Sequence, residues 1–289
     1  MTIPVKTLAG GFPLPEYGLG TWGMGGRQRY DPDNDDQADI QAIQTAIEAG
    51  ITHLDTAEIY AAGHAEIFVG QTIKGYDRAK LFLASKVSGD HLGYDQVLRA
   101  CERSLKRLGT DYLDLYLIHW YNHHYPLAKT IQAMDKLVDD GLVKWIGVSN
   151  FNTTHLKKAQ ELSSHPIVCN QVHYSLEFRE SEVTGLLKYC QENNVMLVAW
   201  RPIGKGKLTA QVPEVVNDIC QKYSKTPAQI AINWLVSQPN VVTISKTRSA
   251  KHLKENLGGV GWQMKPTDVE KLRREYPDQK KVSDAMPLG

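Results

Sequence analysis

Short apolar runs alternate with helical patterns along most of the chain, and this alternation limits the fold more than any other feature. The runs are rich in Val, Ile, Leu and Tyr, which is typical of strands covered on both faces. Between them, apolar residues recur at helical spacing, as in residues 94–108, where the pattern ends at Gly109, a residue favoured just after a helix. The eight runs are at residues 17–21, 51–55, 81–86, 112–120, 143–149, 166–171, 195–200 and 241–245.

Eight strands with intervening helices predict a (β/α)8 TIM barrel of the α/β class, because neighbouring parallel strands need a crossover connection. No linker divides the sequence, so residues 1–289 are expected to form one barrel domain. An open, doubly wound sheet is the alternative, although such sheets usually have fewer strands.

Three segments fall outside the repeat. Residues 5–16 resemble a β-hairpin that turns at Gly10-Gly11 and is expected to close the bottom of the barrel. Two helical segments, 213–223 and 227–237, lie between the seventh and eighth strands, so one of them is an extra helix. The C-terminal tail, 258–289, is expected to hold a short helix near 267–275 and then an irregular end.

Composition predicts a soluble globular protein. Hydrophobic residues make up 42% and charged residues 22% of the 289 residues, and the formal net charge of +1 indicates neither a nucleic-acid nor a membrane partner. The N-terminus does not resemble a signal peptide, and no apolar run approaches the length of a membrane span. The four cysteines lack CxxC spacing, which favours buried free thiols and a cytoplasmic location. No coiled-coil pattern demands a partner, so we expect a monomer.

Polar residues stand where several predicted strands end. Asp55 and Tyr60 follow the second strand, Lys86 ends the third and His119 the fourth. Loops converge at this end of a barrel, so the four side chains are expected to meet there. Asp55 and Lys86 would then offset each other's charge, and the ammonium would lower the pKa of the Tyr60 phenol. The alternative is a structural ion pair beside a packed aromatic ring.

The motifs "LDTAEIY", "ASKV", "LIHW", "GVSN", "NQVHY" and "ISKT…KENL" resemble, in this order, those of the aldo-keto reductase superfamily. The resemblance runs from about Gly18 to Leu257. It implies a (β/α)8 barrel, a nicotinamide cofactor without a metal, and reduction of a small-molecule carbonyl substrate. It also implies that Asp55, Tyr60, Lys86 and His119 are the catalytic residues, with Tyr60 as the proton donor.

The same resemblance implies an NADPH (NADP+) site, with NADH as the second candidate. Ser149, Asn150 and Gln171 match the holders of the carboxamide, and Trp200 replaces the Tyr that usually stacks on the nicotinamide. Residues 201–208 resemble a pyrophosphate-covering loop, and 246–256 the adenosine 2′-phosphate and adenine site. His252 stands where many members have Arg, which weakens selectivity for the phosphate. The implied cofactor contacts are Gly20, Thr21, Trp22, Asp55, Ser149, Asn150, Gln171, Trp200, Arg201, Pro202, Ile203, Gly204, Lys205, Gly206, Ile244, Ser245, Lys246, Thr247, Arg248, His252, Glu255 and Asn256.

Aromatic residues after the strand ends suit a carbonyl substrate with an apolar part. The expected substrate contacts are Trp22, Tyr60, His119, Trp120 and Tyr121. A short loop after His119 and a modest tail predict an open site, and no metal site is expected at the adjacent histidines 123–124. Two other functions stay open: a cofactor-binding regulatory subunit with little turnover, as for some relatives that partner membrane channels, and the same chemistry run as an alcohol dehydrogenase.

Overall fold

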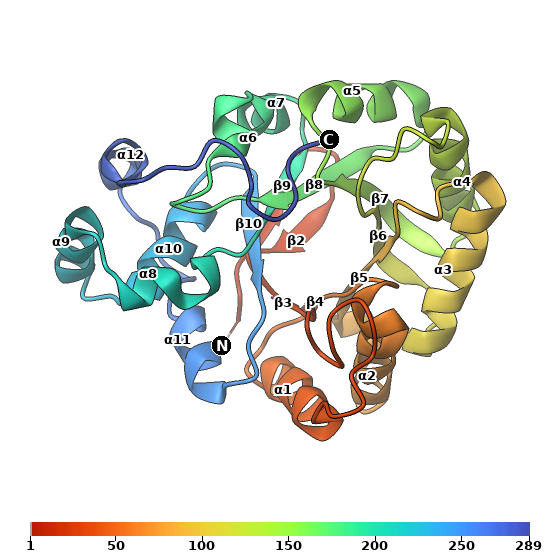
Figure 1. The fold of residues 1–289 in the computed structure, drawn as a ribbon, viewed down its shortest axis with the longest axis horizontal. Coiled ribbons are helices and arrows are strands. Elements are labelled where there is room, and N and C mark those ends of the chain that lie inside the picture. The colour runs from red at the N-terminus through yellow and green to blue at the C-terminus, as the bar shows by residue number, and fades with distance from the viewer. Residues whose placement is uncertain (1) are drawn as a thin grey trace.

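Eight parallel strands close into a barrel in the computed structural model, which describes residues 2–289 (Figure 1). Around the barrel the strands follow one another in chain order, and β10 pairs with β3 to close the ring. The (β/α)8 prediction is therefore confirmed, and the alternative of an open sheet is wrong. The strands are β3 (Tyr17–Gly20), β4 (His53–Asp55), β5 (Phe82–Val87), β6 (Leu113–Ile118), β7 (Val143–Ser149), β8 (Ile167–His173), β9 (Met196–Trp200) and β10 (Val241–Ser245).

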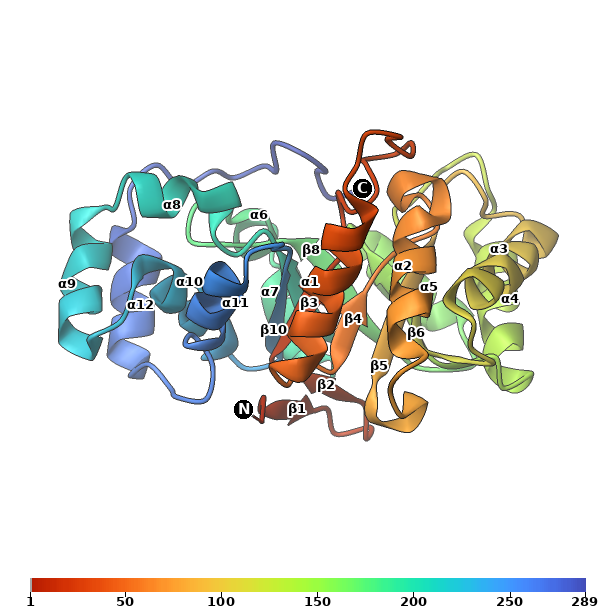
Figure 2. The same ribbon diagram turned by 90° about the horizontal axis from the view of Figure 1, so that it is seen from below.

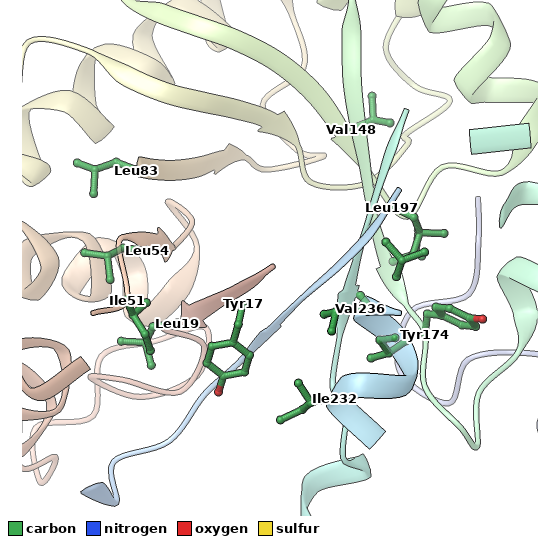
Figure 3. Close-up of a cluster of buried hydrophobic side chains, with 14 of the residues drawn as sticks. Tyr17, Leu19, Ile51, Leu54, Leu83, Val148, Tyr174, Leu197, Ile232 and Val236 are labelled. Atoms are coloured by element: carbon green, nitrogen blue, oxygen red, sulfur yellow. The ribbon is translucent and has the colours of Figure 1, made fainter. Parts of the chain in front are cut away.

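Side chains alternate between the barrel interior and the layer of helices, because successive residues of a strand point to opposite faces. In β5, Leu83 belongs to the outer core and Ala84 to the inner core. Figure 3 shows part of the outer core, with Leu19 and Leu54 beside Ile51 and with side chains of α10 near β10. This layer removes apolar surface from water on both sides of each strand, which is the main source of stability in such a fold.

Local sequence signals set the helix boundaries. The predicted helix at 94–108 forms as α3 and stops at Gly109, whose φ of 63° suits glycine. The helix α10 begins at Pro227, and the Thr226 side chain accepts a hydrogen bond from the Gln229 amide. The helices are α1 (Asp36–Glu48), α2 (His64–Ile73), α3 (Tyr94–Leu108), α4 (Leu127–Asp139), α5 (Thr153–Leu162), α6 (Glu180–Val183), α7 (Leu186–Glu192), α8 (Lys207–Ala210), α9 (Glu214–Tyr223), α10 (Pro227–Val236), α11 (Ala250–Leu257) and α12 (Pro266–Glu275), with 3₁₀ turns η1 (Tyr60–Gly63), η2 (Arg78–Lys80) and η3 (Gly204–Gly206).

The N-terminal hairpin closes the bottom of the barrel, as predicted (Figure 2). Its strands, β1 (Val5–Thr7) and β2 (Pro13–Pro15), pair in antiparallel fashion. Phe12 is buried against the rings of Phe82 and Trp145, and it joins the inner core. On the other side, Lys6 Nζ donates to three carbonyl groups at the end of α10 and the start of β10. The hairpin thus leaves only the opposite end of the barrel free for chemistry.

The connection between β9 and β10 holds α9 and α10 as predicted, and the short α8 precedes them. All four cysteines are buried and free. Within residues 2–289, no helix combines the length and the apolar character needed to span a bilayer. The same residues contain no cluster of three or more His, Cys, Asp or Glu side chains able to hold a metal ion.

Candidate active site

Strand alternation brings the predicted polar side chains together at the upper end of the barrel. Ala84 and Leu117 belong to the inner core, so Lys86 and His119, two positions further along the chain, follow on the same inward side. Asp55, the last residue of β4, is buried beside Lys86. Three strands thus deliver an acid, an amine and an imidazole to one place, as expected.

A chain of contacts links the buried amine to the phenol. Lys86 Nζ lies 2.6 Å from Asp55 Oδ1 and donates to the Thr56 carbonyl at 2.9 Å and to Tyr60 Oη at 3.1 Å. The other carboxylate oxygen of Asp55 accepts from Gln171 Nε2 at 2.8 Å. The Asp55 and Lys86 side chains are 1% and 0% exposed. The ammonium therefore has three oxygen partners, as a buried cation requires.

The pKa values of this cluster differ in one respect from the sequence-based expectation. Lys86 lowers the pKa of Tyr60, but the burial of the phenol outweighs this effect and leaves the pKa above 10.0. The expectation of a net lowered phenol pKa is therefore wrong, because desolvation disfavours the phenolate. Burial also acts to lower the pKa of Lys86, but attraction to Asp55 prevails and raises it above 10.5. At neutral pH the site holds a protonated phenol next to an ammonium ion.

An unusual turn presents Tyr60. The next two residues, Ala61 and Ala62, have φ values of 49° and 54°. Left-handed conformations cost alanine about 1 kcal/mol or more each, so the surroundings must hold them. The Ala61 and Ala62 amides donate to the carbonyl groups of Arg27 and Gln28 at 2.6 and 3.0 Å. The loop after β3 thus fixes the turn that carries the phenol.

The imidazole of His119 is kept neutral. Burial and the neighbouring Lys86 lower its pKa well below 6.5. Its Nδ1 atom is buried without a hydrogen-bond partner among residues 2–289. The ring centre lies 5.6 Å from that of Tyr60. A neutral imidazole at this distance can donate a hydrogen bond to the same substrate oxygen that the phenol faces.

Of the three aromatic residues predicted to contact the substrate besides Tyr60, two lie beside Tyr60 and His119. Trp22 is 39% exposed and packs edge-on against Tyr60, with ring centres 5.0 Å apart. The centre of Trp120 lies 5.0 Å from that of His119. Tyr121 instead stacks on His155 at 3.7 Å, on the side of α5. Trp22 and Trp120 are thus the aromatic side chains that directly flank the phenol and the imidazole.

The residues predicted to hold a carboxamide are brought together, and one of their polar atoms lacks a partner. Ser149 Oγ donates to the Gln171 carbonyl at 2.8 Å, and Asn150 Nδ2 donates to Ser149 Oγ at 2.9 Å. Asn150 has a φ of 60° and also donates to the His119 carbonyl. Asn150 Oδ1 is buried with no donor among residues 2–289. An amide N–H group of a nicotinamide would supply the missing hydrogen bond, so these residues fit the group.

Predicted contacts at β3 and β9 flank this cluster. Gly20 ends β3, and the Thr21 hydroxyl donates to the Asp55 carbonyl at 3.0 Å. Trp200 ends β9, and His173 stacks on it with ring centres 4.2 Å apart and an interplanar angle of 10°. One face of the indole is therefore covered, and a nicotinamide ring could stack only on the opposite face.

The predicted pyrophosphate loop begins in a left-handed conformation and contains a 3₁₀ turn. Arg201, Gly204 and Gly206 have φ values of 58°, 56° and 86°. Arg201 lies 3.4 Å from Asp284 of the tail, and Lys207 forms an ion pair with Glu177 at 2.8 Å. In the same loop Pro202 is buried and Ile203 half-buried, and the side chain of Lys205 lies outside the described part of the structure.

The predicted adenosine site surrounds the start of α11. Lys246 is exposed, and its pKa is lowered by partial burial and by the neighbouring Arg248. The Ser249 hydroxyl caps the helix at the His252 amide. The start of a helix favours an anion, which agrees with a phosphate at this place. His252 is exposed and Glu255 half-buried, while Ile244, in β10, is buried in the inner core.

Two predicted contacts in this region are used inside the protein. Asn256 Nδ2 donates to Tyr17 Oη at 3.1 Å and to Ser245 Oγ at 3.3 Å. Tyr17 Oη and Ser245 Oγ are hydrogen-bonded to each other. Both N–H groups of the Asn256 amide are therefore occupied, and only its carbonyl oxygen remains for an adenine ring.

Arg248 has partners that the sequence did not reveal. Its Nε and Nη2 atoms both bond the carboxylate of Asp39, and Nη2 also donates to Asn34 Oδ1 at 2.6 Å. Asp39 is fully buried and also accepts from the Gly25 amide at 2.8 Å. Asp39 is the last residue of the acidic stretch "DPDNDDQAD", which no predicted motif includes. The predicted phosphate ligand is thus bound to the loop after β3.

The C-terminal tail runs along the β8–β10 side of the barrel end (Figure 1). Both oxygens of the buried Glu180 accept tail amides, from Ser283 at 2.9 Å and from Leu288 at 3.1 Å. Further on, the Gly289 amide donates to the Asn150 carbonyl at 2.9 Å. Glu180 thus fixes the tail beside Asn150, and the open site inferred from the modest tail stays a prediction.

The chain resembles known reductases over nearly its whole length. The profile described as "Aldo/keto reductase family" matches residues 16–276. Methylglyoxal reductase YeaE of Escherichia coli (strain K12) is 34% identical over 276 residues, covering 94% of this chain and 94% of that protein. The crystal structure of the thermostable aldo-keto reductase Tm1743 with the inhibitor epalrestat has a TM-score of 0.89 at 42% identity, over 94% of this chain and 99% of that one. An aldo-keto reductase from Klebsiella pneumoniae in complex with NADPH has a TM-score of 0.83 at 34% identity, over 98% of each chain.

Proposed function

The chain belongs to the aldo/keto reductase family of NAD(P)H-dependent oxidoreductases, and we propose that it reduces small aldehydes or ketones with NADPH, using Tyr60 as the proton donor. The observation that carries the proposal is the buried contact chain from Asp55 through Lys86 to Tyr60. We further propose that the whole chain works as one barrel domain.

The proposed roles follow from charge and distance. NADPH, when bound, supplies the hydride to the carbonyl carbon. The Tyr60 hydroxyl gives its proton to the carbonyl oxygen, on which negative charge develops. Lys86, 3.1 Å from the phenol oxygen, stabilises the charge that remains on Tyr60. The neutral imidazole of His119 donates a hydrogen bond to the same substrate oxygen, and Asp55 and Gln171 keep Lys86 in place.

The raised pKa of Tyr60 keeps the phenol protonated at neutral pH, which is the form that carbonyl reduction uses. Reduction needs a protonated phenol, whereas oxidation of an alcohol needs a phenolate that accepts the proton. Burial holds the phenol in the protonated form. We therefore propose that the ratio of the initial rates of oxidation and reduction rises towards alkaline pH, as the phenol loses its proton.

The substrate we propose is a small carbonyl compound with an apolar part, for example methylglyoxal, on which the Escherichia coli relative acts by its name. Trp22 and Trp120 flank the phenol and the imidazole, and this supports an apolar contact next to the reacting carbonyl.

The test is Tyr60→Phe, which removes one hydroxyl group. NADPH consumption with methylglyoxal and a panel of small aldehydes should fall at least about a hundredfold in kcat, the usual contribution of a general acid. NADPH affinity, measured by fluorescence titration, should stay within about twofold. Tyr189→Phe is the matched control, because Tyr189 bonds Gln160 on the helical surface and should keep full activity.

Two results would contradict the proposal. If Tyr60→Phe retained more than a few per cent of the wild-type rate, Tyr60 would not be the donor. If the wild type consumed no NADPH across the panel but bound it tightly, the chain would be a regulatory subunit.

The choice of NADPH is tested separately. Lys246 lies between β10 and Ser249, the N-cap of α11, where it would attract the 2′-phosphate. We expect kcat/KM to be higher with NADPH than with NADH, and the reverse order would overturn this choice.

A further inference from the structure

The loop after β3, residues 21–35, connects two regions that lie at different ends of the proposed cofactor site. We call it the β3–α1 loop. Its first part carries Trp22, which packs against Tyr60. Its middle part gives the Arg27 and Gln28 carbonyl groups to the strained turn after Tyr60. Gly25 lies so close to this turn that an added Cβ would be 3.1 Å from the Cβ of Ala61.

The carboxylate of Asp39, in α1, binds two residues of the β3–α1 loop. Asp39 accepts the Gly25 amide at 2.8 Å and Asn34 Nδ2 at 2.9 Å. A fully buried carboxylate needs a cation or several donors. Arg248 supplies the cation with two bonds, and it also reaches the Asn34 side chain and the Gly23 carbonyl. One guanidinium group therefore ties the segment after β10 to both ends of the loop.

The same geometry limits what Arg248 can give to a cofactor phosphate. The hydrogen bonds of Arg248 to residues 2–289 use Nε and Nη2, so among these residues only Nη1 is left without an acceptor. Its charge is balanced by Asp39, and Asp35 and Asp36 also act on it. The side chains of Arg248 and Lys246 are both exposed, but Lys246 forms no ion pair with any described residue, although Asp39 attracts it from a distance. Attraction for a phosphate falls mainly on Lys246.

We propose that Arg248 is a positioning residue which, through Asp39, holds the β3–α1 loop and thereby the turn that carries Tyr60. The expected effect of Arg248 on catalysis rests on the proposed function, whereas its effect on the opening of the β3–α1 loop does not. The sequence of contacts runs from Arg248 to Asp39, to Gly25 and the loop, and then to Ala61.

The first test uses trypsin on the cofactor-free chain and needs no activity. Arg27 and Arg29 are exposed on the loop, beside a cleft of about 590 Å³, so trypsin can cut there once the loop opens. Arg248→Met should raise the rate of cleavage after Arg27 and Arg29, read from fragment masses, by about tenfold. Asn34→Ala should act in the same direction, and Lys246→Met, the matched control, should change nothing.

The second test separates kcat from KM. Arg248→Met should lower kcat by about tenfold with NADPH and NADH alike, because the Tyr60 turn loses its support, and should change KM for NADPH by less than about threefold. Arg248→Lys, which keeps one bond to Asp39, should restore much of kcat. Lys246→Met should raise KM for NADPH at least about tenfold and leave KM for NADH unchanged.

Clear results would overturn the proposal. If Arg248→Met left the trypsin rate unchanged, Arg248 would not hold the loop. If it raised KM for NADPH with kcat intact, Arg248 would act as a phosphate ligand and not as a positioning residue. If no carbonyl were reduced by the wild type, the proposed function would fail, while the trypsin result would still decide whether Arg248 holds the loop.

Discussion

Replacing Asp55 by Asn should show how much of the free energy of unfolding depends on the charge of this one carboxylate. In the wild type Lys86 Nζ lies 2.6 Å from Asp55 Oδ1, and both side chains are almost completely buried. The substitution preserves the shape but leaves the ammonium with only neutral partners, the Thr56 carbonyl and the Tyr60 hydroxyl. Removing one partner of a buried ion pair costs about 3–5 kcal/mol of the free energy of unfolding. For 289 residues, this lowers Tm by about 5–8 °C.

The sign of the pH dependence gives a sharper test. In the wild type the pKa of Lys86 is raised above 10.5, so its stabilising effect is complete below that value. In Asp55→Asn the burial of Lys86 acts without the opposing carboxylate, and its pKa falls below that of the unfolded chain. The penalty is then largest at neutral pH and declines as the pH approaches 10.5. The difference in Tm between wild type and variant should therefore narrow from pH 7 to pH 10.

Thermal unfolding followed by circular dichroism, without cofactor, measures both effects. The matched control is Asp140→Asn, the same substitution in the exposed ion pair of Lys136 and Asp140. This variant should shift Tm by less than about 1 °C, because exposed pairs contribute little. Equal shifts for the two variants, or a difference that does not narrow at pH 10, would refute the view that Asp55 keeps a buried ammonium charged.

Two further predictions concern residues near the site. His53 is buried with neither ring nitrogen bonded among residues 2–289, and burial lowers its pKa to about 4. The stability that the neutral imidazole allows is complete above pH 6.5. About 3 kcal/mol of the free energy of unfolding is lost as the pH falls from 6.5 towards 4. His53→Leu should therefore flatten the decline of urea-unfolding free energy between pH 6.5 and 4, and an unchanged decline would contradict the assignment. An added Cβ at Gly89 would overlap the indole of Trp120, so Gly89→Ala should raise KM for a carbonyl substrate about tenfold with KM for NADPH unchanged. Equal KM values in wild type and variant would show that Trp120 does not shape the substrate site.

Sequence alone predicted the parts of the site that follow from periodicity. The eight strands appear within a few residues of their expected positions, and the two-residue alternation explains why Lys86 and His119 point inward with Ala84 and Leu117. Strand ends of a parallel barrel meet at one place, so the cluster of four polar residues needed no knowledge of individual contacts.

Features that depend on distant partners could not be predicted. Arg248 and Asp39 are 209 positions apart, and no local sequence pattern predicts that they form an ion pair. Glu180 and Ser283 are 103 positions apart, so the path of the tail was not visible. The pKa of Tyr60 depends on how completely the phenol is buried, which outweighs the nearby cation that sequence analysis identified. Local sequence patterns determine the helices and strands. Burial and contacts between residues far apart in the chain determine the pKa values and ion pairs of the site.

The position of the tail has a practical consequence for handling the protein. The Gly289 carbonyl accepts the Asn152 amide at 2.8 Å, close to Tyr121, so any peptide fused after Gly289 would start at the end of the barrel that holds the proposed site. The N-terminal hairpin and the C-terminus lie on opposite faces of the barrel (Figure 2), so the hairpin is remote from the proposed site. Affinity tags, dyes and surface tethers should accordingly be attached at the N-terminal side, which leaves the entrance unobstructed.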